Sequence, residues 1–316
     1  MRKEFLIEIG TPDDYNYISG RIKILESLLL KRETFERLSG AELSKLKEIL
    51  FETPYKPFIK GDKSEDLLDA VFERFRAELS EMEKYASEGF VNAFFRNKEV
   101  FLKLKKWALM GETEEESELY SSLEKFVHNG GEDFPPIFFA AFRKMSEVKE
   151  NPLEVGITLD VFRLKYLLDS AEETRSQLIK YYYDTYAEVS LKNMLFRMSG
   201  FVRSSLIDIN DMRDALLMIS ENFPQFGFTF SLKGIKETEQ FESFVSENLK
   251  NTDSVFVQKA LTKILDRGKF FNTGIEVVFA YLKKLEFEVS TLSMVLSGKQ
   301  AGMESGEILK KVVLTS

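Results

Sequence analysis

The sequence predicts an all-α protein, and three observations support that fold class. Alternation of apolar and polar residues, which is typical of half-buried strands, is nearly absent. Apolar residues recur instead at intervals of three and four, as they do on one face of an amphipathic helix. Glycine and proline fall between these segments, where helices are expected to end. Only residues 228–230, Phe-Thr-Phe, suggest a brief extended piece.

Length and composition predict a folded chain of more than one unit. At 316 residues, the chain is long enough for two or three compact units with their own cores. A hydrophobic content of 44% beside 30% charged residues is ordinary for a globular protein. The 29 phenylalanines are expected to fill the interfaces between helices.

The first helices are expected within residues 15–86. One runs from Tyr15 to about Leu30. Ser39 and Glu42 have the spacing of a capping box, in which each side chain bonds a free amide at a helix start. Prolines 54 and 57 end this segment. Residues 62–86 form a strongly amphipathic helix, whose predicted buried face consists of Leu68, Val71, Phe72, Phe75, Leu79 and Met82.

The next segments contain the first boundary between units. Gly89 precedes a helix that carries Phe94, Phe101, Leu104 and Trp107. The acidic run at 111–118 is interpreted as the first turn of a helix, where carboxylates meet the positive end of the helix dipole. Asn151 and Pro152 are typical of a helix start, with a capping side chain followed by proline at the first position. The boundary is therefore expected between residues 111 and 151.

The remaining chain is predicted to be helical almost throughout. Helices are expected over 158–170, 171–198, 238–249 and 255–265. The longest, over 274–303, is long enough to brace a whole domain. Its apolar stripe is formed by Ile275, Val278, Leu282, Leu285, Val289, Leu292 and Leu296, while Lys283, Lys284, Glu286 and Glu288 fall outside the stripe.

Part of the long helix resembles a segment 100 positions earlier in the sequence. Glu288-Val289-Ser290 followed by Met294 matches Glu188-Val189-Ser190 followed by Met194. A period of this size indicates duplicated helical units rather than short solenoid repeats, whose periods are about 20–50 residues.

Charge and composition exclude several classes of function. The net charge of −8 argues against nucleic acid and an acidic membrane surface as binding partners. The absence of cysteine excludes disulfides, thiolate metal sites and cysteine nucleophiles, and it favours a cytosolic protein. No stretch approaches the roughly 20 apolar residues of a membrane span, so we expect membrane contact only through another protein.

No catalytic, cofactor or metal site is predicted. The single histidine, His128, has Glu124 four residues before it, but a metal needs three or four converging ligands. Lys299 follows Gly298, yet the other residues of a phosphate-binding loop are missing, so Lys299 is interpreted as offsetting the dipole at a helix C-terminus. Arg21 and Arg197 are expected to anchor carboxylates, within the fold or at an interface.

Both ends and the middle of the chain carry a resemblance to a known family. Near the N-terminus these residues are Tyr15, Tyr17, Arg21-Ile22-Lys23, Leu28-Leu29-Leu30, Phe35-Glu36-Arg37-Leu38 and Thr53-Pro54-Tyr55. Near the C-terminus they are Phe279-Ala280, Glu288-Val289, Leu296-Ser297-Gly298-Lys299, Gly302 and Ile308. With the middle segment from Glu188 to Arg197, they resemble the central-stalk C subunits of the archaeal and bacterial A/V-type rotary ATPases. The departures are Leu191 and Thr291 in place of asparagine, Ser293 in place of arginine and Glu188 in place of aspartate.

The resemblance implies an architecture and a role. It implies three similar helical units, over about 1–110, 111–210 and 211–316, arranged as a funnel with pseudo-threefold symmetry. Members of the family lie between the membrane ring of proteolipid subunits and the central shaft of subunits D and F. The chain is then a non-catalytic socket that transmits torque for proton or sodium transport, cytoplasmic and peripheral to the membrane. Its candidate structural or interface residues are Arg21, Glu188, Arg197, Glu288 and Lys299.

Two other functions remain open at this point. A free-standing helical adaptor would be a stable soluble monomer without a ring partner. An enzyme with an unrecognised site would need a cleft with converging carboxylates or Ser/Lys pairs.

Overall fold

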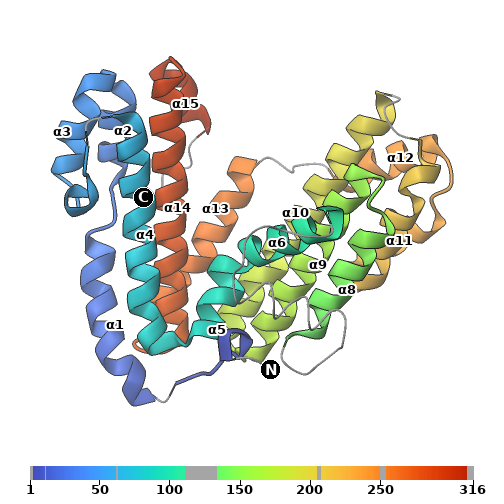
Figure 1. The fold of residues 1–316 in the computed structure, drawn as a ribbon, viewed down its shortest axis with the longest axis horizontal. Helices are drawn as coiled ribbons and strands as arrows, with labels where there is room; N and C mark the ends of the chain where they lie inside the picture. The colour runs from blue at the N-terminus through green and yellow to red at the C-terminus, as the bar shows by residue number, and fades with distance from the viewer. Residues whose placement is uncertain are drawn as a thin grey trace. The chain divides into compact units, whose positions relative to one another are not determined.

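The computed structural model describes residues 3–10, 12–61, 63–110, 134–204, 208–249 and 254–311. These residues form helices joined by turns, with no strand among them, and this confirms the predicted all-α class (Figure 1). The chain divides into two compact units. Unit 1 comprises Met1–Glu8, Glu88–Arg175 and Tyr183–Thr252, and unit 2 comprises Ile9–Ser87, Ser176–Tyr182 and Asp253–Ser316. The division into three similar units stays a prediction.

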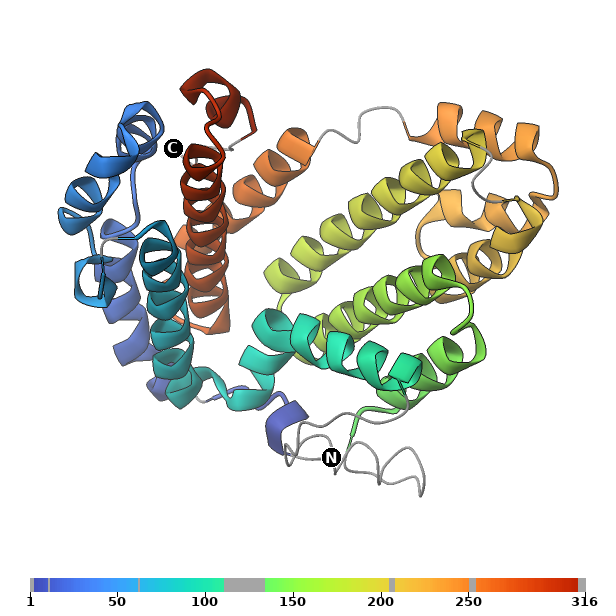
Figure 2. The ribbon, with the colours of Figure 1, turned by 45° about the horizontal axis from the view of Figure 1, so that its top comes forward.

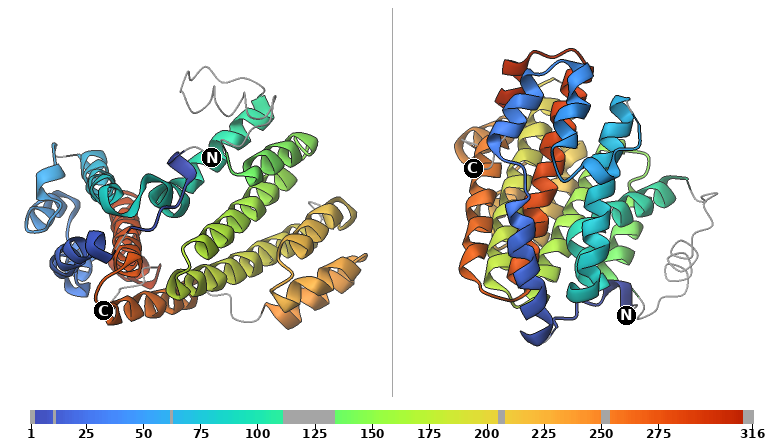
Figure 3. Two further views of the ribbon diagram at one scale, coloured as in Figure 1. Left: turned by 90° about the horizontal axis from the view of Figure 1, so that it is seen from below. Right: turned by 90° about the vertical axis from the view of Figure 1, so that its left-hand side faces the viewer.

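Unit 2 is built around the long helix α14 (Ile275–Gln300), which packs against α1, α2, α4 and α13. Figure 3 shows α1, α4 and α14 running alongside one another in its right-hand view. The helices of this unit are α1 (Pro12–Ser27), α2 (Arg32–Gly40), α3 (Leu46–Phe51), α4 (Ser64–Ala86), α13 (Ser254–Leu265), α14 and α15 (Ser305–Lys311), with 3₁₀ turns η2 (Leu43–Lys45), η3 (Lys56–Phe58) and η7 (Asp266–Phe270).

Helix α14 is buried on more than its predicted stripe. All seven residues of the stripe are buried, as the sequence predicts. Lys283 and Glu288, which were expected outside the stripe, are also buried, with only 5% and 6% of their surface exposed. Neighbouring helices cover α14 on several sides, so a charged residue outside the stripe can still lie in the interior.

The buried face of α4 also differs from the predicted one. Val71, Leu79 and Met82 are buried as expected, whereas Phe72 is exposed. Arg74 occupies the interior instead, together with Leu67, Ala70 and Ala86. On this face the Arg74 guanidinium pairs with the Glu288 carboxylate of α14.

Unit 1 packs its helices around aromatic side chains. Helices α6, α8 and α9 pack pairwise, and α11 packs on α9 (Figure 2). The ring of Phe138 lies 5.1–5.4 Å from the rings of Phe5, Phe101 and Tyr166. The elements of this unit are η1 (Lys3–Phe5), α5 (Glu88–Val91), the π-helical turn η4 (Asn92–Arg96), α6 (Asn97–Met110), α8 (Pro136–Glu147), α9 (Pro152–Glu173), most of α10 (Gln177–Arg203), η5 (Asn210–Met212), α11 (Arg213–Asn222), η6 (Gly227–Gly234) and α12 (Thr238–Asn248).

One glycine and one asparagine explain features of the local structure in unit 1. A Cβ at Gly89 would lie 2.1 Å from the carbonyl oxygen of Leu6, so only glycine allows the N-terminal segment to pass this closely. Asn151 caps α9 as predicted, because its Oδ1 accepts hydrogen bonds from the amides of Leu153 and Glu154.

Three local predictions are wrong. The break between the two central helices lies at residues 174–176, where Arg175 has a φ of 55°, rather than after residue 170. Residues 228–230 lie in the 3₁₀ turn η6, because the buried Thr229 hydroxyl donates to the carbonyls of Phe223 and Phe226. Ser39 lies inside α2 and donates to the Glu36 carbonyl, so it does not form a capping box with Glu42.

Some predictions fall outside the described residues. These are the acidic run at 111–118, the pair Glu124 and His128, and therefore most of the expected boundary region between 111 and 151.

Candidate functional site

The most elaborate polar cluster of unit 2 is centred on Glu288. Its Oε1 accepts hydrogen bonds from the Tyr55 hydroxyl at 2.7 Å and from Arg74 Nη1 at 2.9 Å. Its Oε2 accepts one from the Leu30 amide at 2.5 Å. The carboxylate on α14 thereby joins three other segments, which are α4, the turn between α1 and α2, and the turn before η3.

The cluster is deeply buried, which sets its electrostatics. The Arg74 side chain is 3% exposed and that of Glu288 is 4% exposed. The guanidinium carbon of Arg74 lies 4.5 Å from the centre of the Tyr55 ring, a cation–π contact. Burial raises the pKa of Glu288 above its usual value, and the opposing effects of Arg74 and of the two other donors reduce the rise without reversing it. Burial also raises the pKa of the Tyr55 hydroxyl, which therefore stays protonated as a donor.

We expect the Glu288 contribution to stability to fall as the pH rises. The raised pKa means that the folded state holds this proton at pH values where the unfolded state has lost it. Stability is then fully present below the usual glutamate pKa and is lost as the pH rises through the raised folded value. The measurement is the unfolding free energy of the wild type and of Glu288→Gln as a function of pH. As the pH rises across this window, the wild type should lose unfolding free energy relative to Glu288→Gln. A relative gain by the wild type would show that Arg74 affects the pKa of Glu288 more than burial does.

Arg21 lies in a second, more exposed ion pair of unit 2. Its Nη1 lies 2.6 Å from Oε1 of Glu81, and Lys84 Nζ bonds the other oxygen of that carboxylate. Because the Arg21 side chain is 37% exposed, solvent screens the pair and it adds little to stability.

A cavity of about 640 Å³ in unit 2 reaches one side of Glu288. Across it, Lys284 pairs with Glu26 at 3.2 Å and with Asp266 at 3.5 Å. The charged side chains in its lining balance in number, with Lys31, Arg32, Lys269 and Lys284 opposite Glu26, Glu33, Asp266 and Glu288. The cavity therefore has no net charge to select an ionic ligand.

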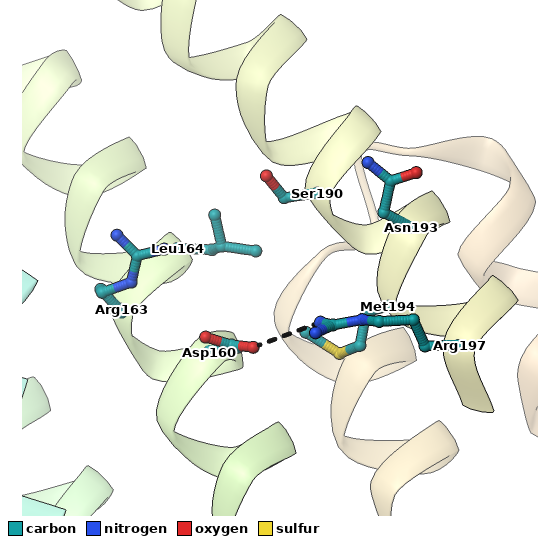
Figure 4. Close-up of a pocket in the computed structure, with 7 residues that line it drawn as sticks. All are labelled: Asp160, Arg163, Leu164, Ser190, Asn193, Met194 and Arg197. Carbon is teal, nitrogen blue, oxygen red and sulfur yellow. Dashed lines mark ion pairs between the residues drawn. The ribbon is translucent and has the colours of Figure 1, made fainter. Parts of the chain in front are cut away.

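Unit 1 has a smaller polar pocket between α9 and α10. Figure 4 shows the seven side chains that line it, with the Asp160 carboxylate of α9 facing the Arg197 guanidinium of α10. Their closest atoms are 3.7 Å apart. The pocket also includes Arg163 of α9 and Ser190 and Asn193 of α10, and its volume is about 160 Å³.

The structure separates the other predicted residues. Glu188 bonds Lys192 on its own helix at 2.6 Å and is partly exposed. Its counterpart in the similar segment, Glu288, is buried in an interhelical cluster, so the two positions have different environments. Lys299 lies in the last turn of α14, as predicted. Within unit 2, the three candidates Arg21, Glu288 and Lys299 therefore have different surroundings.

Sequence reasoning missed Arg74, the cation that pairs with Glu288. A signal for it was present, because Arg74 follows Ala70 and Val71 by four and three residues and therefore continues their face of the helix. A charged residue on an apolar face must find a partner, and the buried carboxylate of α14 is that partner.

The described residues contain no cluster of three or more side chains that could hold a metal ion. None of the described helices has the length and apolar content needed to cross a membrane.

Fold and polar clusters together define an all-α protein in which the buried Arg74–Glu288 pair joins α4 to α14 and the Asp160–Arg197 pair joins α9 to α10. Comparison with known families then identifies it more closely. The model of the ATP synthase (C/AC39) subunit family matches residues 18–311, so the chain belongs to the C/AC39 subunits of V/A-type ATP synthases. A comparison with curated protein sequences gave no match.

Proposed function

We propose that this chain is the central-stalk component that couples the shaft, formed by subunits D and F, to the membrane proteolipid ring. The observation that carries the proposal is the family match over residues 18–311. In this role the chain transmits torque for proton or sodium transport and catalyses nothing itself. It lies in the cytoplasm and meets the membrane only through its partner subunits.

The packing inside unit 2 supports a mechanical role. Helix α14 packs against α1, α2, α4, α13 and α15, and the carboxylate of its Glu288 bonds three separate segments. Close-packed interiors have low compressibility and transmit strain. A protein that passes torque between two partners needs this stiffness.

The first test is an affinity pull-down of the tagged full chain from detergent-solubilised membranes of its source. We expect the proteolipid ring and the shaft subunits to co-purify and to be identified by mass spectrometry. Untagged membranes serve as the control. If none of these subunits is recovered while the rest of the ATPase stays intact, the chain is a free-standing adaptor instead.

A second measurement separates coupling from catalysis. Removal of the chain should abolish ATP-driven ion uptake by membrane vesicles but leave ATP hydrolysis by the soluble head, because the head and the ring then lack their connection. Loss of hydrolysis by the isolated head would contradict a non-catalytic role.

A further inference from the structure

The pocket between α9 and α10 has an unusual lining for a contact between two helices. On α10, Tyr186, Ser190, Asn193 and Arg197 follow one another at intervals of three and four, so they share one face of the helix. All four are polar, and the last three line the pocket. Figure 4 shows the Ser190 hydroxyl pointing from α10 towards α9. Helix interfaces are usually closed by apolar side chains, so this face calls for a different explanation.

The two arginines of the pocket have weak partners. Arg163 donates only to neutral groups within the described chain, the Asn97 side-chain oxygen at 3.5 Å and the Tyr186 hydroxyl at 3.4 Å. Both distances are near the limit of a hydrogen bond. Arg197 has a single carboxylate partner there, Asp160, at 3.7 Å, whereas a charge-assisted bond is typically about 2.7–2.9 Å.

The side chains that line the pocket carry a net charge of one positive unit. Arginine stays protonated in proteins, so Arg163 and Arg197 together outnumber the one carboxylate, Asp160. A volume of about 160 Å³ exceeds the roughly 30 Å³ of a liquid water and has room for a small anionic group. The Arg197 side chain is 65% exposed, so the pocket can be reached from solvent.

We propose that this pocket binds a single carboxylate group. A carboxylate has two oxygens that match the forked donors of a guanidinium, and the hydroxyl of Ser190 and the amide of Asn193 supply further neutral donors. A phosphate dianion fits less well, because Asp160 would repel its second charge. The carboxylate comes either from a free small acid or from an acidic side chain or chain end of a neighbouring subunit; the second source rests on the proposed function.

The first experiment uses the isolated full chain with isotope-labelled arginine and follows the Nε–Hε resonances by NMR. Sodium acetate is the probe, and sodium chloride at the same ionic strength is the reference. We expect acetate to shift the Arg163 and Arg197 resonances saturably, while Arg203, an exposed arginine on the same helix, stays unchanged. Shifts that equal those in chloride overturn the proposal. A stronger response to phosphate than to acetate overturns the choice of a carboxylate.

Two variants are expected to change acetate binding in opposite directions. Arg197→Gln should weaken acetate binding about tenfold or more, since a hydrogen bond to a charged group is worth roughly 1.5–3 kcal/mol. Asp160→Asn should strengthen binding, because it removes the carboxylate that competes for Arg197. Arg203→Gln is the matched control on α10 and should leave binding unchanged. Weaker binding in Asp160→Asn would contradict the proposed pocket chemistry.

The source of the carboxylate is distinguished in the assembled complex. In Arg197→Lys the introduced amine can be joined to a carboxylate in contact with it by a zero-length carbodiimide crosslink. A crosslink to an acidic residue of a neighbouring subunit, absent in Arg203→Lys, assigns the ligand to that subunit. A crosslink to Asp160 alone excludes a neighbouring subunit as the source, so that the acetate response of the isolated chain then assigns the pocket to a free acid. Because the acetate measurement uses the isolated chain, it succeeds or fails independently of the pull-down.

Discussion

Arg74→Met is expected to destabilise unit 2 by about 3–5 kcal/mol, because it leaves the Glu288 carboxylate buried without its cation. The two remaining donors, the Tyr55 hydroxyl and the Leu30 amide, do not carry a compensating charge. The loss is measured by chemical denaturation of the full chain followed by far-UV circular dichroism. This signal is needed because Trp107, the only tryptophan, belongs to unit 1.

Two further variants test the reason for this loss. Arg76→Met on the same helix removes an arginine whose side chain is 69% exposed, so it should cost less than about 0.5 kcal/mol. The double variant Arg74→Met/Glu288→Gln should recover part of the loss, since glutamine carries no buried charge and keeps one oxygen that can accept from the Leu30 amide, while its NH2 group can donate to the Tyr55 hydroxyl oxygen. If the double variant is as unstable as the sum of the two single ones, the charge is not the cause.

Phe138→Ala is expected to destabilise unit 1 by about 3–5 kcal/mol. The Phe138 ring is 1% exposed and contacts three other aromatic rings, so its removal leaves a cavity in the centre of a cluster. Trp107, which stacks on Phe142 of the same helix α8, reports the transition by its fluorescence.

The neighbouring residue provides the matched control for this variant. Phe139 is 39% exposed, so Phe139→Ala removes the same ring from a site that is not fully packed and should cost clearly less. Equal losses for the two variants would show that the aromatic cluster is not the centre of unit 1.

The sequence allowed the helices to be predicted but not their interior charges. Apolar periodicity was sufficient for α14, α12 and α13, because a repeat at intervals of three and four is a property of the segment itself. The burial of Lys283 and Glu288 depends on which other helices cover α14, and a single segment does not contain that information.

The candidate site shows the same limit. Glu188 and Glu288 have matching neighbours in sequence, yet one bonds a lysine of its own helix and the other bonds three distant segments. Their roles differ because their surroundings differ. The pairing of Arg197 with Asp160 likewise required knowledge that α9 and α10 run alongside each other.

The bond between Glu288 and Leu30 joins residues 258 positions apart, and this has a consequence for synthesis. A ribosome makes the chain from its N-terminus, so residues 9–87 emerge long before α14 exists. During that interval Arg74 lacks its Glu288 partner and the apolar face of α4 has no cover from α14. The segments of unit 1 between them are complete earlier, so the middle of the chain can finish folding before its two ends meet.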